Sequence, residues 1–392
     1  MKDIVIVGGA RTPIGSMGGA IKDIHAADLA AVAIREALRR ANVSAEQVDE
    51  VIIGNVGQVA ENAFIARMSA IRAGLPVNST ALTVNRLCGS GLQAINTAVQ
   101  TIQTGNAEIV VAGGTENMDL LPYYVRKGRY GNRFGHERLE DGLLTALTDP
   151  FGHYAMGVTA EKVAERFNIS REDQDIFALR SQEKAQHAIE NGYFDDEIVP
   201  VEVKGRRGEI TLFEKDEHPR QTSLEKLSKL KPAFQENGTV TAGNASGINQ
   251  GAAAVVIMTK QKAEELGLKP LGYIREQAVT GLEPEIMGFA PASAVKKVLQ
   301  RAGLTLDDID LIELNEAFAA QSLAVIRDLN VSEEKVNPNG GAIALGHPIG
   351  ASGTLLAVKS LYDMKRRGLK RAIVTMCIGG GQGIATIFEN ID

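Results

Sequence analysis

The sequence predicts an α/β fold built from two similar halves, with an insertion of loops and helices between them. Residues 33–52 and 294–313 share one pattern of apolar and charged residues without a gap. Residues 84–114 and 336–377 share a strand end, a small-residue elbow, a helix and a final apolar strand. Parallel strands joined by helical crossovers are buried on both faces, so helices are expected to cover both sides of each sheet.

Length, charge and cysteine content limit the possible classes of protein. The chain has 392 residues, 44% of them hydrophobic, which is enough for two core-forming units. A net charge of −6 argues against a general nucleic-acid or anionic-membrane surface. Two cysteines far apart indicate neither a disulfide framework nor a structural zinc site. No apolar run approaches the roughly 18 residues of a membrane span, and no targeting segment is visible, so we expect a cytoplasmic protein.

The first half opens with a predicted strand at Ile4–Val7. The glycines after it do not form a GxGxxG motif, and Pro13 lies where the helix of a dinucleotide site would begin, so no such site is predicted. A helix is expected from about Ala27 to Ala41. After a polar turn, the apolar run Val51–Ile53 predicts the next strand.

The stretch 84–95 has the pattern of a strand end, a glycine and serine elbow and a helix start. Leu92 opens a run of apolar residues at helical spacing, so Cys88 should lie at or just before the first turn of a core helix. The free N–H groups and helix dipole there stabilise anions, so we expect the pKa of Cys88 to lie below about 8.5. Gly89 and Gly91 leave the sulfur open to a substrate. A packed structural thiol is the competing interpretation.

Residues 117–248 break the repeat and predict the insertion. After a loop-rich start, helices are expected at about 157–167 and 171–191. A basic stretch at 204–231 is typical of a solvated face and can also meet phosphates. Small residues at 241–247 let a ligand lie against the backbone, although a glycine-rich turn has the same composition.

We therefore divide the chain into a first half at residues 1–116, the insertion at 117–248 and a second half at 249–392. The last strand of the first half can return after the insertion. Pseudo-symmetric halves bring equivalent loops to one face. His347 precedes the elbow of the second half and Cys377 follows its last interior strand, so both side chains are expected near the elbow of the first half.

Four motifs carry the candidate chemistry. Cys88 lies in Asn-Arg-Leu-Cys-Gly-Ser-Gly, Asn315 in Asn-Glu-Ala-Phe, His347 in Gly-His-Pro and Cys377 in Cys-Ile-Gly-Gly-Gly. A nucleophile, a histidine base, a second thiol and exposed N–H groups are the components of acyl-transfer chemistry. With these motifs in this order, the whole chain resembles the thiolase family.

This resemblance implies duplicated βαβαβαββ halves stacked as five layers, α-β-α-β-α, with a loop insertion. It also implies an acetyl-CoA acetyltransferase that condenses two acetyl-CoA to acetoacetyl-CoA and CoA, or runs the reverse thiolysis, through an acetyl-cysteine. The coenzyme A thioester is then a substrate, and neither a cofactor nor a metal is expected. A homotetramer made of two dimers, with a role in fatty acid metabolism, is implied as well.

The catalytic roles implied by the resemblance fall on five residues of this chain. Cys88 attacks the thioester, and His347 accepts the thiol proton and then helps to bind the thioester oxygen. Cys377 moves the proton at C2 of the second acetyl-CoA. Asn315 holds a water that joins His347 in one oxyanion hole, and the N–H groups of Cys88 and Gly379 form the other.

Further residues are implied to bind the acyl-CoA. They are Met156, Met287 and Phe318 for the acyl pocket, Ala245, Ser246 and Gly247 for the pantetheine arm, and Arg220 for the nucleotide end. Core packing is the competing interpretation for the two methionines.

Three other functions remain as alternatives. The first is a 3-ketoacyl-CoA thiolase of fatty-acid β-oxidation with a broader range of chain lengths. The second is a 3-ketoacyl synthase of the same superfamily, but such enzymes use two histidines beside the cysteine, whereas this chain has Cys377 at the third position. The third is a catalytically silent acyl-CoA or lipid-binding protein, which is disfavoured because every position with chemistry is filled.

Overall fold

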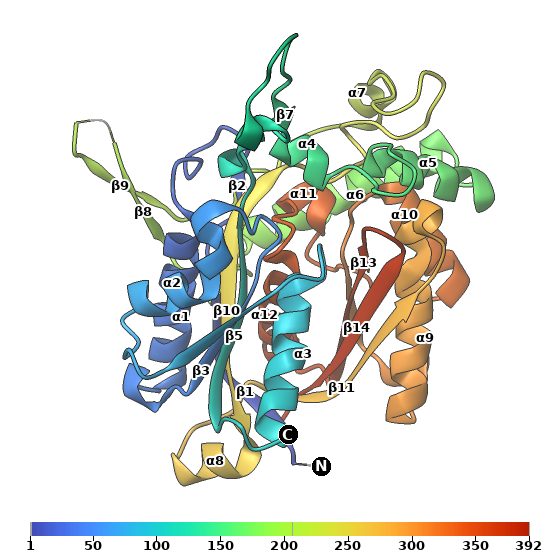
Figure 1. Ribbon diagram of the computed structural model, residues 1–392. Helices are drawn as coiled ribbons and strands as arrows, with labels where there is room; N and C mark the ends of the chain where they lie inside the picture. Colours follow the sequence, from blue (N-terminus) through green and yellow to red (C-terminus); the bar gives the residue numbers. More distant parts are fainter. Residues whose placement is uncertain (1, 206, 392) are drawn as a thin grey trace.

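The computed structural model describes residues 2–205 and 207–391 and contains a mixed sheet divided into two halves (Figure 1). The strands of the first half run in the order β4 (Thr80–Val84), β3 (Glu50–Gly54), β5 (Ile109–Asn117), β10 (Asn249–Thr259) and β1 (Ile4–Arg11). Those of the second half run in the order β11 (Gly272–Gly281), β14 (Gln382–Glu389), β13 (Arg371–Ile378) and β12 (Leu311–Leu314). The two-residue strand β2 (Gly15–Ser16) pairs with β10.

Within the described residues, strand pairing joins the two half-sheets only through a short antiparallel contact, in which Val5 and Ile6 of β1 pair with β11. Among the named strands of the described residues, parallel pairing, which the duplicated pattern led us to expect, joins only β3 with β4 and β5 and β12 with β13. The strands at the centre pair antiparallel: β1 pairs with β10 and β11, β10 also pairs with β5, and β14 pairs with β11 and β13.

Helices form the other three layers. The outer layer on the first half-sheet contains α1 (Ala26–Ala41) and α2 (Ile65–Arg72). The central layer, between the half-sheets, contains α3 (Ser90–Gln103) and α12 (Ser352–Arg367). The outer layer on the second half-sheet contains α9 (Ala290–Ala302), with α10 (Ala319–Leu329) beside it. Apolar side chains fill each interface between layers, and the central cluster joins both half-sheets to α3 and α12. The predicted five-layered α/β fold is confirmed.

Equivalent helix ends reveal the duplication in the backbone. Asn42 ends α1 and Gly303 ends α9, and both adopt the left-handed conformation, with φ angles of 53° and 67°. Asparagine and glycine are the residues that reach this conformation at least cost. The equivalence is weaker at the edge strand, because the counterpart of β4 in the second half is a single parallel bridge between Ile312 and Val336.

The strand that follows the insertion belongs, by its pairing, to the first half-sheet. β10 begins at Asn249, where our division of the sequence starts the second half, and it lies between β1 and β5. Our division of the sequence allowed the last strand of the first half to follow the insertion in this way. Two further short helices, α8 (Lys260–Glu265) after β10 and α11 (Ala342–Leu345) before His347, complete the halves.

Most of the insertion lies over one end of the two half-sheets, at the top of Figure 1, and its paired strands at Val201–Lys204 and Ile210–Phe213 project to the left beside the first half. Its elements are β6 (Tyr123–Tyr124), β7 (Glu140–Asp141), α4 (Gly142–Ala146), α5 (Met156–Arg166), α6 (Arg171–Glu190), β8 (Val201–Lys204), β9 (Ile210–Phe213) and α7 (Leu224–Ser228). The buried guanidinium of Arg11 ties it to β1, because it donates to Glu197 at 2.6 Å and to Asp216 at 2.8 Å. Among the helices in the described ranges, none is both long and apolar enough to cross a membrane.

Candidate active site

A cavity of about 730 Å³ opens between the insertion and the ends of the central helices, and its wall combines residues from all three parts of the chain. The predicted site residues on this wall are Cys88, Met156, Arg220, Ala245, Ser246, Gly247, Met287, Phe318, His347, Cys377 and Gly379. Asn315 is the predicted residue that the wall lacks. It lies behind His347, with its amide nitrogen 3.5 Å from Nε2 of the imidazole.

The Cys88 elbow is built from a strained turn that the flanking side chains hold in place. Gly89 caps α3, so Cys88 lies just before the first helical turn, as predicted. Leu87 has a φ angle of 44°, a conformation that costs a residue of this type about 1–3 kcal/mol. The Leu87 amide donates to the side chain of Asn85 at 2.9 Å, and the Leu87 carbonyl accepts from Ser90 at 2.6 Å. These contacts fix the thiol at the mouth of the elbow.

Two glycines let the N-termini of α3 and α12 touch. A Cβ atom on Gly91 would lie 2.8 Å from the Thr354 nitrogen, and one on Gly353 would lie 2.2 Å from the Leu92 nitrogen. Either distance is shorter than real side chains allow, so a larger residue would push the helices apart. This close approach brings the Cys88 elbow of the first half against the His347 loop of the second.

Burial dominates the electrostatics of Cys88. The N–H groups of Cys88 and Gly379 donate to its sulfur and lower its pKa, but desolvation of the half-buried thiol outweighs them, and the pKa is raised to about 11. The predicted lowering of this pKa is therefore wrong for the unliganded protein. Helix-start geometry stabilises a thiolate, but it does not replace the water that the surrounding apolar side chains exclude.

His347 is held as a neutral imidazole in one tautomer. Burial lowers its pKa to about 4, so it is uncharged at neutral pH. Its Nδ1 lies 2.6 Å from the Ser352 hydroxyl, which itself donates to the Pro348 carbonyl at 2.9 Å. Because a hydroxyl has one hydrogen, Ser352 accepts from Nδ1–H. Nε2 then carries the lone pair, which accepts from the Asn315 amide at 3.5 Å and can take a proton from the pocket.

Cys377 lies in the same wall, at the end of β13. The thiol is buried in an apolar cluster with Met287 and Phe318, with Met156 packed against it. Burial raises the pKa of Cys377 well above the ordinary range, and the neighbouring thiol of Cys88 raises it further. Both thiols are therefore protonated in the resting protein at neutral pH.

Comparison with known proteins agrees with this arrangement over the whole chain. The family models "Thiolase, N-terminal domain" and "Thiolase, C-terminal domain" match residues 4–261 and 268–390. The chain belongs to the thiolase family.

Its relatives include an acetyl-CoA acetyltransferase of Syntrophomonas wolfei, 51% identical over 99% of both chains, and the beta-ketothiolase BktB of Cupriavidus necator, 51% identical over 100% of both. The crystal structure of the Bacillus anthracis acetyl-CoA acetyltransferase matches with a TM-score of 0.98 at 47% identity, covering 100% of this chain and 99% of that one. Human mitochondrial 3-ketoacyl-CoA thiolase in complex with CoA matches with a TM-score of 0.96 at 45% identity, covering 100% and 98%.

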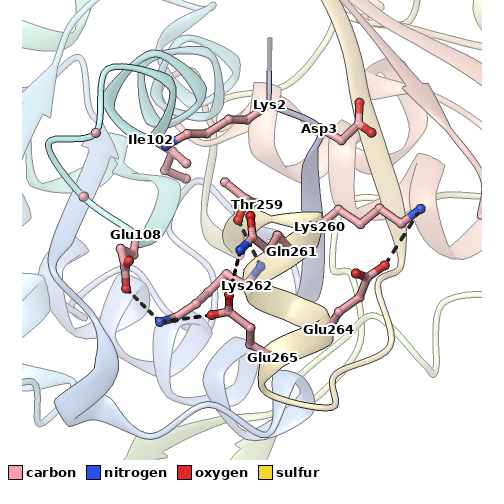
Figure 2. Close-up of a pocket in the computed structure, with 12 residues that line it drawn as sticks. Lys2, Asp3, Ile102, Glu108, Thr259, Lys260, Gln261, Lys262, Glu264 and Glu265 are labelled. Atoms are coloured by element: carbon pink, nitrogen blue, oxygen red, sulfur yellow. Dashed lines mark hydrogen bonds and ion pairs between the residues drawn. The ribbon is translucent and has the colours of Figure 1, made fainter.

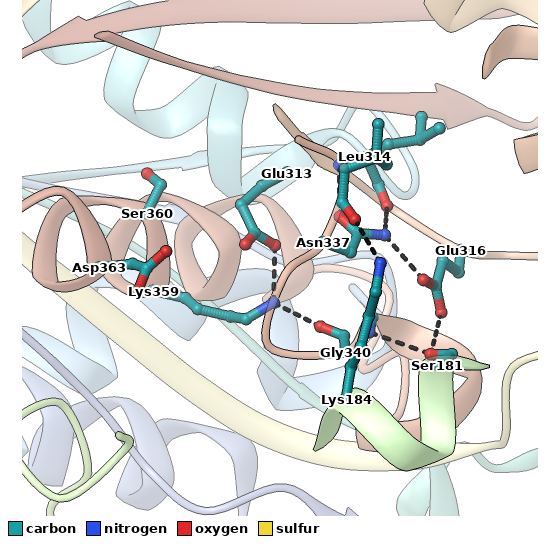
Figure 3. Close-up of polar contacts among 12 residues, drawn as sticks. Ser181, Lys184, Glu313, Leu314, Glu316, Asn337, Gly340, Lys359, Ser360 and Asp363 are labelled. Atoms are coloured by element: carbon teal, nitrogen blue, oxygen red, sulfur yellow. Dashed lines mark hydrogen bonds and ion pairs between the residues drawn. The ribbon is translucent and has the colours of Figure 1, made fainter. Parts of the chain in front are cut away.

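In this member of the family, a buried polar network fixes the motif that carries Asn315 (Figure 3). The Glu316 carboxylate accepts from Ser181 of α6 at 2.6 Å and from Asn337 at 2.8 Å, and it also accepts from the Ile343 amide of α11. Asn337 in turn accepts from the Leu314 amide at 2.9 Å. The network therefore joins the insertion, the end of β12 and the loop that leads to His347.

The predicted acyl-CoA residues line the outer part of the cavity. Ala245 forms a bridge with Phe318, and the Ser246 amide donates to the Ala317 carbonyl at 3.0 Å, so this loop is fixed to the Asn315 motif. Arg220 is exposed at the rim, where its guanidinium donates to the Ala242 carbonyl at 2.9 Å. Phe234 stacks edge-on against Phe318, with ring centroids 6.1 Å apart.

Four residues that sequence reasoning did not assign also shape the site. Ser352 orients His347, and the Asn249 side chain accepts from the His347 amide at 2.9 Å. Glu116 lies beside Cys88 and raises its pKa. His218 lines the cavity, and burial, together with Arg220, lowers its pKa to about 4. The elbow of the second half, which repeats that of the first half in the sequence, marked the position of Ser352. The contacts of Glu116 and Asn249 join residues far apart in the sequence, so no local sequence pattern could predict them.

A second hollow lies at the opposite end of the sheet, beside α8 and the N-terminal strand (Figure 2). It measures about 490 Å³, and ion pairs cross it, including one of 2.8 Å between Lys262 and Glu108. None of the described residues that line it is a cysteine or a histidine. Cys88, His347 and Cys377 all line the first cavity instead.

Proposed function

We propose that the protein is an acetyl-CoA C-acetyltransferase that condenses two acetyl-CoA to acetoacetyl-CoA and CoA, or runs the reverse thiolysis, by a ping-pong mechanism. The observation that carries the proposal is the meeting of Cys88, His347 and Cys377 on one cavity wall. Relatives named as acetyl-CoA acetyltransferases, at about half sequence identity over the full length, support it. The coenzyme A thioester is the substrate, and the reaction requires no further cofactor.

In the first half-reaction, the Cys88 sulfur forms a bond to the thioester carbon of acetyl-CoA while its proton moves to Nε2 of His347. The neutral tautomer of His347 suits this step, because a thiol with a raised pKa needs a base in contact with it. The N–H groups of Cys88 and Gly379 stabilise the oxyanion. The CoA thiolate then leaves with the proton of Cys377, which leaves an acetyl group on Cys88 and a Cys377 thiolate beside the His347 imidazolium.

In the second half-reaction, the Cys377 thiolate removes a proton from C2 of a second acetyl-CoA. The enolate oxygen forms where His347 and a water held by Asn315 can donate to it. The carbanion attacks the acetyl carbon on Cys88, the Cys88 sulfur leaves, and the imidazolium of His347 returns its proton to that sulfur. Protons and charges balance over the cycle, and both thiols and the imidazole regain their resting states.

Intact mass measurement after incubation with acetyl-CoA tests this proposal. One acetyl group should appear on Cys88, and CoA should be released as acetoacetyl-CoA forms. Acetylation of a cysteine that persists in the Cys88→Ala variant during turnover would contradict the assignment. Absence of both acetylation and thiolysis of acetoacetyl-CoA would identify a silent acyl-CoA-binding protein instead.

A 3-ketoacyl-CoA thiolase of β-oxidation is the weaker alternative, because several relatives at about 50% identity are named acetyl-CoA acetyltransferases. Relative rates of thiolysis for 3-ketoacyl-CoA of increasing length separate the two functions. For the acetyl-specific enzyme, the rate is expected to fall steeply beyond acetoacetyl-CoA.

We further propose that the protein acts in the cytoplasm, in fatty acid metabolism, as a homotetramer of paired dimers. Two surface features support assembly. β4 ends the sheet with one edge unpaired among the described residues, and Tyr130 and Phe134 of the insertion are 93% and 98% exposed. Light scattering coupled to size-exclusion chromatography measures the mass, and a monomer would contradict the assembly.

A further inference from the structure

A buried carboxylate beside the cavity has no role in the mechanism above. Glu116 is the last residue but one of β5 and is 1% exposed. Its two oxygens accept four hydrogen bonds, from the amides of Val56 at 2.9 Å, Gly57 at 3.0 Å and Gly350 at 3.0 Å and from the side chain of Asn55 at 3.0 Å. All four partners donate to the carboxylate, which favours its ionised form.

These donors come from opposite halves of the chain. Asn55, Val56 and Gly57 follow β3 of the first half, whereas Gly350 lies in the second half, three residues after His347 and two before Ser352. A Cβ atom on Gly350 would lie 2.5 Å from Oε2 of Glu116, so the close contact depends on glycine. One carboxylate thus joins the β3 loop to the loop that carries the base.

The two loops that Glu116 joins also border the thiol. Val56, whose amide donates to Glu116, and Ile349, which precedes the donor Gly350, pack in one apolar cluster with Cys88. Burial raises the pKa of Glu116 to about 7 against the effect of its donors, and its charge contributes to the raised pKa of Cys88. The carboxylate therefore affects both the geometry and the electrostatics around Cys88.

Resting on the function proposed above, we propose that Glu116 is a positioning residue for acyl transfer, which holds the His347 loop against the β3 loop and so fixes the imidazole relative to Cys88. A purely structural role predicts only a loss of stability. A positioning role predicts a loss in the rate of Cys88 acetylation with little change in substrate affinity, because the groups that bind CoA lie elsewhere on the cavity wall.

The experiment compares Glu116→Gln with Asp49→Asn. Asp49 is an exposed carboxylate control that does not line the cavity, and its carboxylate also accepts backbone amides, those of Glu108 and Ile109 at the other end of β5. Glutamine places an amide NH₂ where N–H donors converge, so the loop must shift. Displacements of about 1 Å at catalytic groups cost on the order of 100-fold. We expect acetyl-Cys88 to form about 10- to 100-fold more slowly in Glu116→Gln, with the KM for acetyl-CoA within about twofold and Asp49→Asn acetylated at the wild-type rate.

The outcomes separate this inference from the proposed function. A wild-type protein that acetyl-CoA does not acetylate would contradict the function itself. Wild-type rates in Glu116→Gln, or an equal loss of rate in Asp49→Asn, would overturn the positioning role alone. If Glu116→Gln does not fold, Asn55→Ala removes one of the four donors and keeps the carboxylate; a rate reduced about two- to fivefold supports the role, and an unchanged rate overturns it.

Discussion

The Ser352 hydroxyl offers a sharp test of how the candidate base is prepared. In Ser352→Ala, Nδ1–H of His347 loses an acceptor at 2.6 Å in a site where the imidazole is only 6% exposed. A buried donor left without a partner costs about 1–3 kcal/mol, and nothing then holds the ring in the tautomer whose Nε2 accepts the thiol proton. If the acylation transition state depends on that tautomer, the rate falls about 5- to 160-fold.

The assay is the single-turnover rate of acetyl-Cys88 formation, measured by quenched-flow mass spectrometry at saturating acetyl-CoA. Ser360→Ala is the matched control, because Ser360 is also buried on α12 and its hydroxyl also donates to a backbone carbonyl, that of Ala357 at 2.9 Å. The control should acetylate at the wild-type rate. Equal rates in both variants would refute the tautomer argument and leave Ser352 as an ordinary helix-start residue.

Three further predictions follow from the same site. Because burial raises the pKa of Cys88 to about 11, the rate of its alkylation by iodoacetamide should rise about tenfold per pH unit from pH 7 to 10. Cys88 should also be alkylated before Cys377. A rate that reaches a plateau at or below pH 8.5 would show that the helix start, and not burial, dominates the pKa of Cys88. Cys377→Ala should still form acetyl-Cys88, but more slowly, because the leaving CoA thiolate loses its proton donor. The variant should neither make acetoacetyl-CoA nor exchange the C2 protons of acetyl-CoA with deuterated solvent, and near-normal condensation would make Cys377 a packed core thiol. Asn315→Ala should keep its melting temperature and lose about 10²- to 10³-fold in condensation rate, whereas a large drop in melting temperature with normal activity per folded molecule would indicate a structural amide.

Local patterns predicted the elements and the position of the nucleophile. The helix expected at 27–41 is α1 at Ala26–Ala41, and the one expected at 171–191 is α6 at Arg171–Glu190. Cys88 lies just before α3, as the elbow pattern indicated. These features depend on helical periodicity and on glycine and serine at helix starts, which are properties of neighbouring residues and can therefore be read from a short stretch of sequence.

The sequence by itself therefore determined the two halves, their helices and the residues that meet at the cavity, while the tertiary structure decided the ionisation and orientation of those residues. The pKa of Cys88 depends on how much water distant side chains exclude, and helix-start geometry alone gave the wrong sign. The tautomer of His347 depends on Ser352, and the contact between Glu116 and Gly350 joins residues 234 positions apart. Desolvation and long-range hydrogen bonds arise only when separate elements pack, so no local pattern encodes their strength.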